Sequence, residues 1–97
     1  KIDIIESSTG NSYCFLFQNG KEGQSKELTI TSSADWTIES SSSGSWLSLS
    51  TMSGKAGKTK LTLSLLKDTY STRFAYNDLI YFKIGGAVMK QIAIIAK

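Results

Sequence analysis

Short runs of alternating apolar and polar residues recur along this 97-residue chain, and each run ends in serine, glycine or asparagine. Alternation with period two places successive side chains on opposite faces of a strand, and the residues between the runs are those that turns favour. The predicted strands are 2–4, 13–18, 28–31, 36–39, 47–49, 61–65, 80–84 and 88–94. No stretch keeps the 3.6-residue period of a helix. The sequence therefore predicts an all-β antiparallel sandwich of about seven or eight strands with negligible helix.

One domain spanning residues 1–97 is expected, because a chain of this length buries roughly two-thirds of its unfolded surface. Each tryptophan opens a short run of alternating residues, which favours burial for both Trp36 and Trp46. Gly85 and Gly86 join the last two predicted strands, and glycine supplies the positive φ angles that a two-residue hairpin turn requires. The predicted core consists of Trp36, Leu47, Leu61, Leu63, Phe82, Ile84, Ile92 and Ile94.

The residue inventory excludes several classes of function. Histidine is absent, which removes Ser-His-Asp and Cys-His catalysis and most zinc sites. No acidic residue has the apolar, aromatic surroundings that would raise its pKa for acid catalysis. The single Cys14 cannot form an internal disulfide and is expected to pack as a small buried group. No catalytic residue, metal ligand or cofactor is therefore predicted.

Charge and hydropathy limit the partners. The net charge is +3, carried by ten scattered lysines and one arginine. Nucleic-acid sites gather arginine, so no nucleic acid is expected as a partner. No apolar run approaches the roughly 18 residues that span a bilayer, so no membrane insertion by this segment is expected.

Residues 67–78 form the best candidate binding segment. It joins two predicted strands, and loops at the ends of a sandwich commonly carry recognition. Sugar rings stack on aromatic side chains, while polar groups bind their hydroxyls. The predicted ligand-binding residues are Tyr70, Arg73, Phe74, Tyr76 and Asn77. In the alternative interpretation, Phe74 and Tyr76 only cover one end of the core.

Lys55, Lys58 and Lys60 form the one local cluster of positive charge. Lys58 and Lys60 are two residues apart in a predicted strand, so they should project from one face. Such an edge would attract an anionic partner, for example a uronic-acid or sulfated glycan. The same lysines could instead protect a sheet edge against pairing with other chains. Both interpretations stay open.

Several spaced motifs together resemble the BACON domain, a Bacteroidetes-associated module named for a proposed carbohydrate-binding role and frequent N-terminal placement. The resemblance covers about residues 15–95. It rests on Leu28, Thr29 and Ile30 before Asp35, Trp36, Thr37 and Ile38, on Ser45, Trp46 and Leu47, on Ser53 and Gly54 through Gly57, on Lys60, Leu61, Thr62 and Leu63, on Arg73, and on the glycine hairpin. The order of tryptophan, tryptophan and glycine is more specific than any one of these pieces.

The resemblance implies an immunoglobulin-like sandwich that serves as a non-catalytic accessory module. It also implies export to the periplasm or outer cell surface, as part of a larger lipoprotein or secreted protein from which this chain is a cropped piece. Candidate partners are a carbohydrate, either a plant polysaccharide or a mucin glycan, and other domains of the same polypeptide. The alternative is a structural spacer or protein–protein interaction module with no affinity for glycans.

Overall fold

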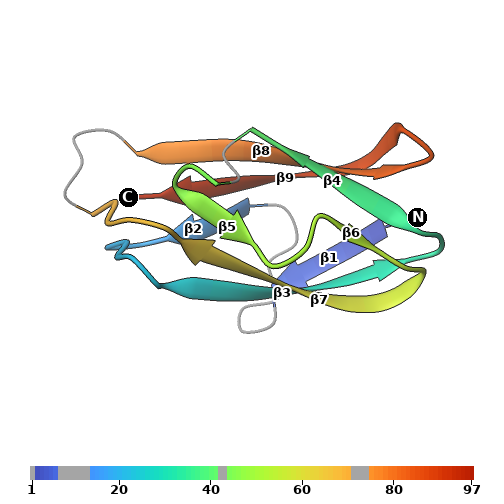
Figure 1. Ribbon diagram of the computed structural model, residues 1–97, viewed down its shortest axis with the longest axis horizontal. Coiled ribbons are helices and arrows are strands. Elements are labelled where there is room, and N and C mark those ends of the chain that lie inside the picture. The colour runs from blue at the N-terminus through green and yellow to red at the C-terminus, as the bar shows by residue number, and fades with distance from the viewer. Residues whose placement is uncertain (1, 7–13, 42–43, 71–74) are drawn as a thin grey trace.

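The computed structural model describes residues 2–6, 14–41, 44–70 and 75–97, and all of its regular structure is β-strand. Nine strands form two facing sheets in an elongated molecule (Figure 1). They are β1 (Ile2–Glu6), β2 (Cys14–Phe17), β3 (Ser25–Ser32), β4 (Trp36–Ser40), β5 (Leu47–Leu49), β6 (Ser53–Gly54), β7 (Gly57–Leu65), β8 (Tyr76–Ile84) and β9 (Ala87–Ala96). The predicted all-β sandwich is confirmed, with one strand more than expected.

The first sheet has the strand order β1-β3-β7-β5, and the second has the order β2-β9-β8-β4-β6. Every pairing is antiparallel except that of β2 with β9, which is parallel. The first two strands thus belong to different sheets, so the N-terminal part of the chain helps to hold both layers together.

The core lies between the sheets and consists of the inward side chains of both. Phe15, Phe17 and Phe82 are fully buried, and both tryptophans are almost completely buried, as predicted. Of the eight predicted core residues, seven are buried. Ile84 is the exception, because it lies at the end of β8 and packs only partly against the core.

The two outer faces differ in polarity. Along β3 and β7 the outward positions carry threonine, serine, glutamate and lysine, as the strand patterns require. On the second sheet, Leu16 and Leu79 are exposed apolar residues, and Ala93 and Ile95 lie between them in register. Cys14 is also on this outer face and is half-buried, whereas it was predicted to pack as a buried group. The adjacent Phe15 takes the inward position instead.

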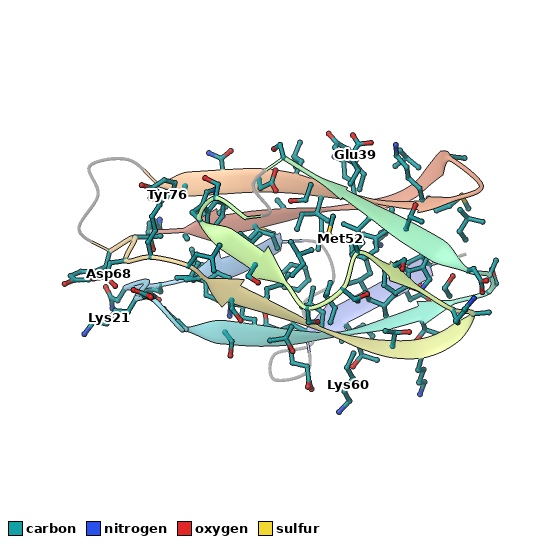
Figure 2. All side chains as sticks on the ribbon, in the orientation of Figure 1. Lys21, Glu39, Met52, Lys60, Asp68 and Tyr76 are labelled. Carbon is teal, nitrogen blue, oxygen red and sulfur yellow. The ribbon has the colours of Figure 1, made fainter. Side chains whose placement is uncertain are left out.

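The β8–β9 hairpin links the two ends of the molecule. Its turn has positive φ angles at Gly85 (59°) and Gly86 (84°), which confirms the predicted glycine turn. Nine residues of β8 rise by about 27 Å at 3.3–3.4 Å per residue. Tyr76, where β8 begins, therefore lies at the opposite end of the sandwich from the glycine turn (Figures 1 and 2).

Candidate functional site

The predicted binding segment lies where β7 ends and β8 begins. Tyr70 is 50% exposed, Tyr76 is half-buried, and Asn77 is exposed on the outer side of β8. Arg73 and Phe74 lie outside the described residues. Of the described aromatic residues in this segment, Tyr70 presents an open ring and Tyr76 is in a more enclosed position.

The backbone around Tyr70 is tied to the turn between β2 and β3. The carbonyl oxygen of Gly20 accepts hydrogen bonds from the peptide N–H groups of Thr69 (2.8 Å) and Tyr70 (3.0 Å). The Asp68 carboxylate accepts another from the N–H of Glu22 (2.9 Å). A side chain at Gly20 would collide with Thr69, since its Cβ would lie 1.9 Å from the Thr69 hydroxyl oxygen. These contacts hold Tyr70 in one position at the end of the sandwich.

A lysine ammonium lies over each of the two tyrosine rings. The Nζ atom of Lys21 is 5.6 Å from the centre of the Tyr70 ring, and that of Lys67 is 5.1 Å from the centre of the Tyr76 ring. Tyr76 also packs on the buried Trp46, with 5.5 Å between ring centres. We call the group Lys21, Lys67, Asp68, Tyr70 and Tyr76 the aromatic end; Figure 2 labels three of its members.

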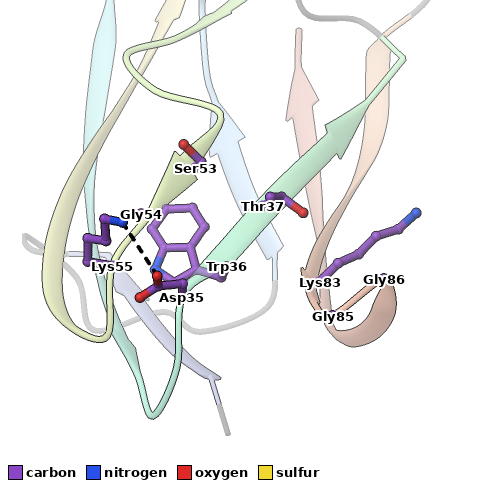
Figure 3. Close-up of a pocket in the computed structure, with 9 residues that line it drawn as sticks. All are labelled: Asp35, Trp36, Thr37, Ser53, Gly54, Lys55, Lys83, Gly85 and Gly86. Atoms are coloured by element: carbon purple, nitrogen blue, oxygen red, sulfur yellow. Dashed lines mark hydrogen bonds and ion pairs between the residues drawn. The ribbon is translucent and has the colours of Figure 1, made fainter.

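A cleft of about 530 Å³ lies at the other end of the sandwich, beside the glycine turn (Figure 3). Three strands of the second sheet build it. Thr37 of β4 is in register with Ser53 of β6 on one side and with Lys83 of β8 on the other. Neighbouring strands are about 4.8 Å apart, so these three polar residues lie in a row across the sheet, and the Lys83 ammonium extends from this row to Glu39. The residues that line the cleft are 35–37, 53–55, 83, 85 and 86.

Trp36 forms the buried wall of the cleft, and Gly54 lies against its indole ring. A Cβ atom on Gly54 would come within 2.2 Å of the ring, so only glycine allows this contact. Trp36 also packs on Phe82, with 5.7 Å between ring centres. The indole nitrogen is buried and has no hydrogen-bond partner among the described residues. The indole N–H of Trp36 is therefore an unused hydrogen-bond donor in this wall.

Two ion pairs flank the cleft. Lys55 lies 3.5 Å from the Asp35 carboxylate, and Lys83 lies 2.6 Å from the Glu39 carboxylate. Asp35 also accepts a hydrogen bond from the peptide N–H of Ala56 (3.0 Å). This hydrogen bond, with the nearby Lys55 ammonium, holds the pKa of Asp35 below its usual value of 3.8. Asp35 is thus a fixed carboxylate at one side of the cleft.

The described residues supply aromatic rings, hydroxyl groups, ammonium groups and carboxylates at the two ends. Among the described residues, no three potential metal ligands of the histidine, cysteine or acidic type come together. The described part of the chain contains no apolar helix of the length that crosses a membrane. The sequence indicated the aromatic end but missed the cleft. Its local signals were Asp35 before a tryptophan, Lys55 in the lysine cluster and the glycine turn, and the proximity of these residues depends on how β4, β6 and β8 pair.

Comparison with known protein families gives a match to the model described as the viral BACON domain, at residues 7–94. Because the match spans most of the chain, the chain belongs to this family. The predicted BACON resemblance is therefore confirmed at the level of the domain type, whereas the matching model is the viral form and is not specific to Bacteroidetes. Domains of this family are non-catalytic accessory domains. No curated protein matches the sequence.

Three solved structures show the same fold at low sequence identity. A Bacteroides ovatus GH5 xyloglucanase in complex with a XXXG heptasaccharide matches with a TM-score of 0.70 and 18% identity, over 97% of this chain and 18% of that one. The ASH/PapD-like domain 7 of human CEP192 matches with a TM-score of 0.59 and 14% identity, over 100% of this chain and 84% of that one. WR4, a C. elegans MSP family member, matches with a TM-score of 0.51 and 15% identity, over 86% of this chain and 89% of that one. This chain thus spans less than a fifth of the xyloglucanase chain.

Proposed function

We propose that this BACON domain is a non-catalytic accessory module that binds a carbohydrate weakly at its aromatic end. The proposal rests above all on the half-exposed ring of Tyr70, whose backbone N–H donates a hydrogen bond to the Gly20 carbonyl oxygen. An exposed aromatic ring beside charged groups is the arrangement that stacks on a sugar ring and binds its hydroxyls. Family membership and the fold shared with a domain-sized part of a xyloglucanase support a carbohydrate-related role.

The lysine over the Tyr70 ring does not prevent stacking. An exposed cation–π contact is worth about 0.5–1 kcal/mol, so a sugar ring can displace the Lys21 ammonium at small cost. The displaced ammonium can then donate hydrogen bonds to sugar hydroxyls, as can Lys67. The Asp68 carboxylate accepts the Glu22 N–H at one oxygen, which leaves its other oxygen to accept from a hydroxyl. Asn77, Arg73 and Phe74 remain predicted contributors to this site.

Titration calorimetry against plant polysaccharides and mucin O-glycans tests the proposal. We expect dissociation constants in the micromolar to millimolar range, about −8 to −4 kcal/mol. Tyr70→Ala should abolish measurable binding, and Tyr70→Phe should retain it, because the phenylalanine ring keeps the stacking surface. Tyr70 is half-exposed, so neither variant should unfold the domain. Absence of binding across the whole panel would contradict a carbohydrate role.

A second candidate function is a spacer or protein–protein interaction module. The observation that favours it is the apolar outer face of the second sheet, where Leu16 and Leu79 are exposed on either side of β9. Exposed apolar patches of this kind mark contact surfaces. On either function, we propose that the domain works at the outer surface or in the periplasm as part of a larger exported protein. If none of the glycans tested by calorimetry binds, this second function is the better explanation.

A further inference from the structure

We propose that the cleft between Asp35 and the glycine turn is a second binding site, selective for oxyanion-bearing sugars such as uronic acids or sulfated sugars. It lies at the opposite end of the sandwich from the aromatic end, so it stands whether or not the carbohydrate site proposed above exists (Figures 1 and 3). Its volume of about 530 Å³ is within the range of small-molecule sites.

The argument starts from the balance of hydrogen-bond donors and acceptors in the cleft. A lysine ammonium has three N–H donors. Lys83 uses one on Glu39, and Lys55 makes one long contact with Asp35, so each keeps two donors for a ligand. Lys55 is also highly exposed, with a side-chain exposure of 89%, and it can turn toward a bound group.

The glycine turn adds further donors. In a two-residue turn the hydrogen bond of the turn joins the flanking residues, so the N–H groups of Gly85 and Gly86 stay open. Neither amide donates to any described residue. Neither glycine has a side chain to cover them, and a Cβ added at either position would meet only open space.

The carboxylate acceptors of the cleft, by contrast, are fewer than its donors and are partly used. One oxygen of Asp35 accepts the Ala56 N–H, and the other faces Lys55. The Thr37 and Ser53 hydroxyls can donate or accept and so fit either kind of ligand. The unused capacity of the cleft is therefore mainly donor capacity. A ligand that supplies several acceptors and a negative charge satisfies it best, and charge-assisted hydrogen bonds are about twice as strong as neutral ones.

A neutral sugar would leave this donor excess only partly satisfied, because each hydroxyl brings a proton along with its lone pairs. It would also find no exposed aromatic ring in the cleft, since Trp36 is buried under Gly54. These two features distinguish the cleft from the aromatic end. They are the reason why the cleft should prefer a sugar that carries a negative charge. A uronate carboxylate and a sulfate ester share the required chemistry.

The two indole N–H groups make a direct test by NMR of the ¹⁵N-labelled domain. Trp36 lines the cleft, whereas Trp46 packs on Tyr76 at the aromatic end. Trigalacturonate and a sulfated chondroitin tetrasaccharide are titrated separately to distinguish the carboxylate and sulfate sources. With at least one of them, the Trp36 indole signal and the Gly85 and Gly86 amides should shift while the Trp46 signal stays. The fully methyl-esterified trigalacturonate, which lacks the charge, should give no such shift.

Matched lysine variants complete the test. Lys83→Gln and Lys55→Gln should each weaken binding about three- to tenfold, as expected for loss of a solvent-exposed charged hydrogen bond. Lys97→Gln removes the same charge at an exposed position outside both proposed sites and should leave the affinity unchanged. Equal weakening by all three variants would mean non-specific adhesion of a polyanion and would overturn the proposal. So would a methyl ester that binds as well as the acid, or no response at Trp36 to either acid.

The result also separates this proposal from the function proposed above. Shifts at Trp46 and the Tyr70 amide with neutral glycans, together with no response at Trp36 to either acidic oligosaccharide, would support the aromatic end and contradict the cleft. Shifts confined to Trp36 and the glycine turn, with acidic sugars alone, would support the cleft and contradict the aromatic end.

Discussion

Individual residues at the two ends owe their positions to backbone contacts that a side chain would block. Gly20 lies so close to Thr69 that any Cβ would collide with the threonine, and its carbonyl oxygen holds Tyr70. Gly54 lies in the same way against Trp36. Neither glycine is required for a positive φ angle, unlike Gly85 and Gly86. The close approach itself is the reason for glycine at both positions.

Asp35 provides a pH-dependent contribution to stability. Its pKa is lowered in the folded state by the Ala56 N–H and the Lys55 ammonium, so folding favours the ionised form. This contribution is present above about pH 3.8, the unfolded value, and is lost as the pH falls through the lower folded pKa. We expect the carboxyl ¹³C signal of Asp35 to titrate with a midpoint below 3.8 in the folded domain.

The matched variant for Asp35 is Asp35→Asn, which keeps an oxygen acceptor for the Ala56 N–H but cannot ionise. Its melting temperature should fall less than that of the wild type between pH 4.5 and the folded midpoint. A wild-type midpoint at or above 3.8, or identical pH profiles of the two proteins, would contradict this account of Asp35.

At the scale of strands, local pattern predicted most elements, because one face of each sheet is buried and the other is solvated. The run 61–65 shows this directly: its three leucines are buried and the residues between them are not. The glycine hairpin was also predictable, because its turn chemistry is local. What could not be predicted depends on pairing between distant segments. β6 has only two residues and exists because Ser53 and Gly54 pair with β4.

Two inward-facing acidic residues were equally beyond local pattern. Asp78 is buried and accepts hydrogen bonds from the hydroxyls of Ser40 and Ser41. Because these bonds satisfy the carboxylate, β8 can begin at Tyr76, before the predicted apolar strand 80–84. Glu6 is buried beside Lys26, 3.1 Å away on β3. In both cases a partner from another strand makes burial of a carboxylate acceptable. The cleft escaped prediction for the same reason, because three separate strands bring its residues together.

The contact between β6 and β4 should limit the stability of the cleft end. Gly54→Ala places a methyl group within van der Waals conflict of the Trp36 ring, which is buried and cannot move without displacing Phe82. We expect a loss of about 1–3 kcal/mol in the free energy of unfolding, as for other overpacked sites. Urea unfolding measures it. Ser53→Ala, at the adjacent exposed position, is the control and should change stability by less than about 0.5 kcal/mol. Equal stability of the two variants would show that β6 can move away from the Trp36 ring at little cost in free energy.

The whole molecule has two distinct ends and two distinct outer faces. The ends carry the aromatic group and the donor-rich cleft, separated by the length of β8 (Figures 1 and 3). The outer face of the first sheet is polar, and that of the second is partly apolar. A small module with this division can bind ligands at its ends and still contact a neighbouring surface through one face. The sequence predicted the faces through alternation, but it could not show which residues the ends bring together.

Self-association of the whole domain should depend on Lys58 and Lys60. Both are exposed on the outer side of β7, in the part of the strand that pairs with β3 but not with β5. Among the described residues, no strand is assigned to the other side of β7 from Gly57 to Leu61, so its backbone forms an open edge. Charged lysines on such an edge discourage pairing with a second chain, whereas threonine favours strand structure and is neutral.

We therefore expect the double variant Lys58→Thr/Lys60→Thr to form concentration-dependent oligomers, while the wild type stays monomeric, as measured by size-exclusion chromatography with light scattering. The control is Lys55→Thr/Lys67→Thr, which removes the same charge at positions outside β7 and should remain monomeric. Oligomers of both double variants would point to loss of net charge as the cause. A monomeric Lys58→Thr/Lys60→Thr variant would show that these lysines are ordinary solvated residues, because an open, uncharged edge would then be harmless in this fold.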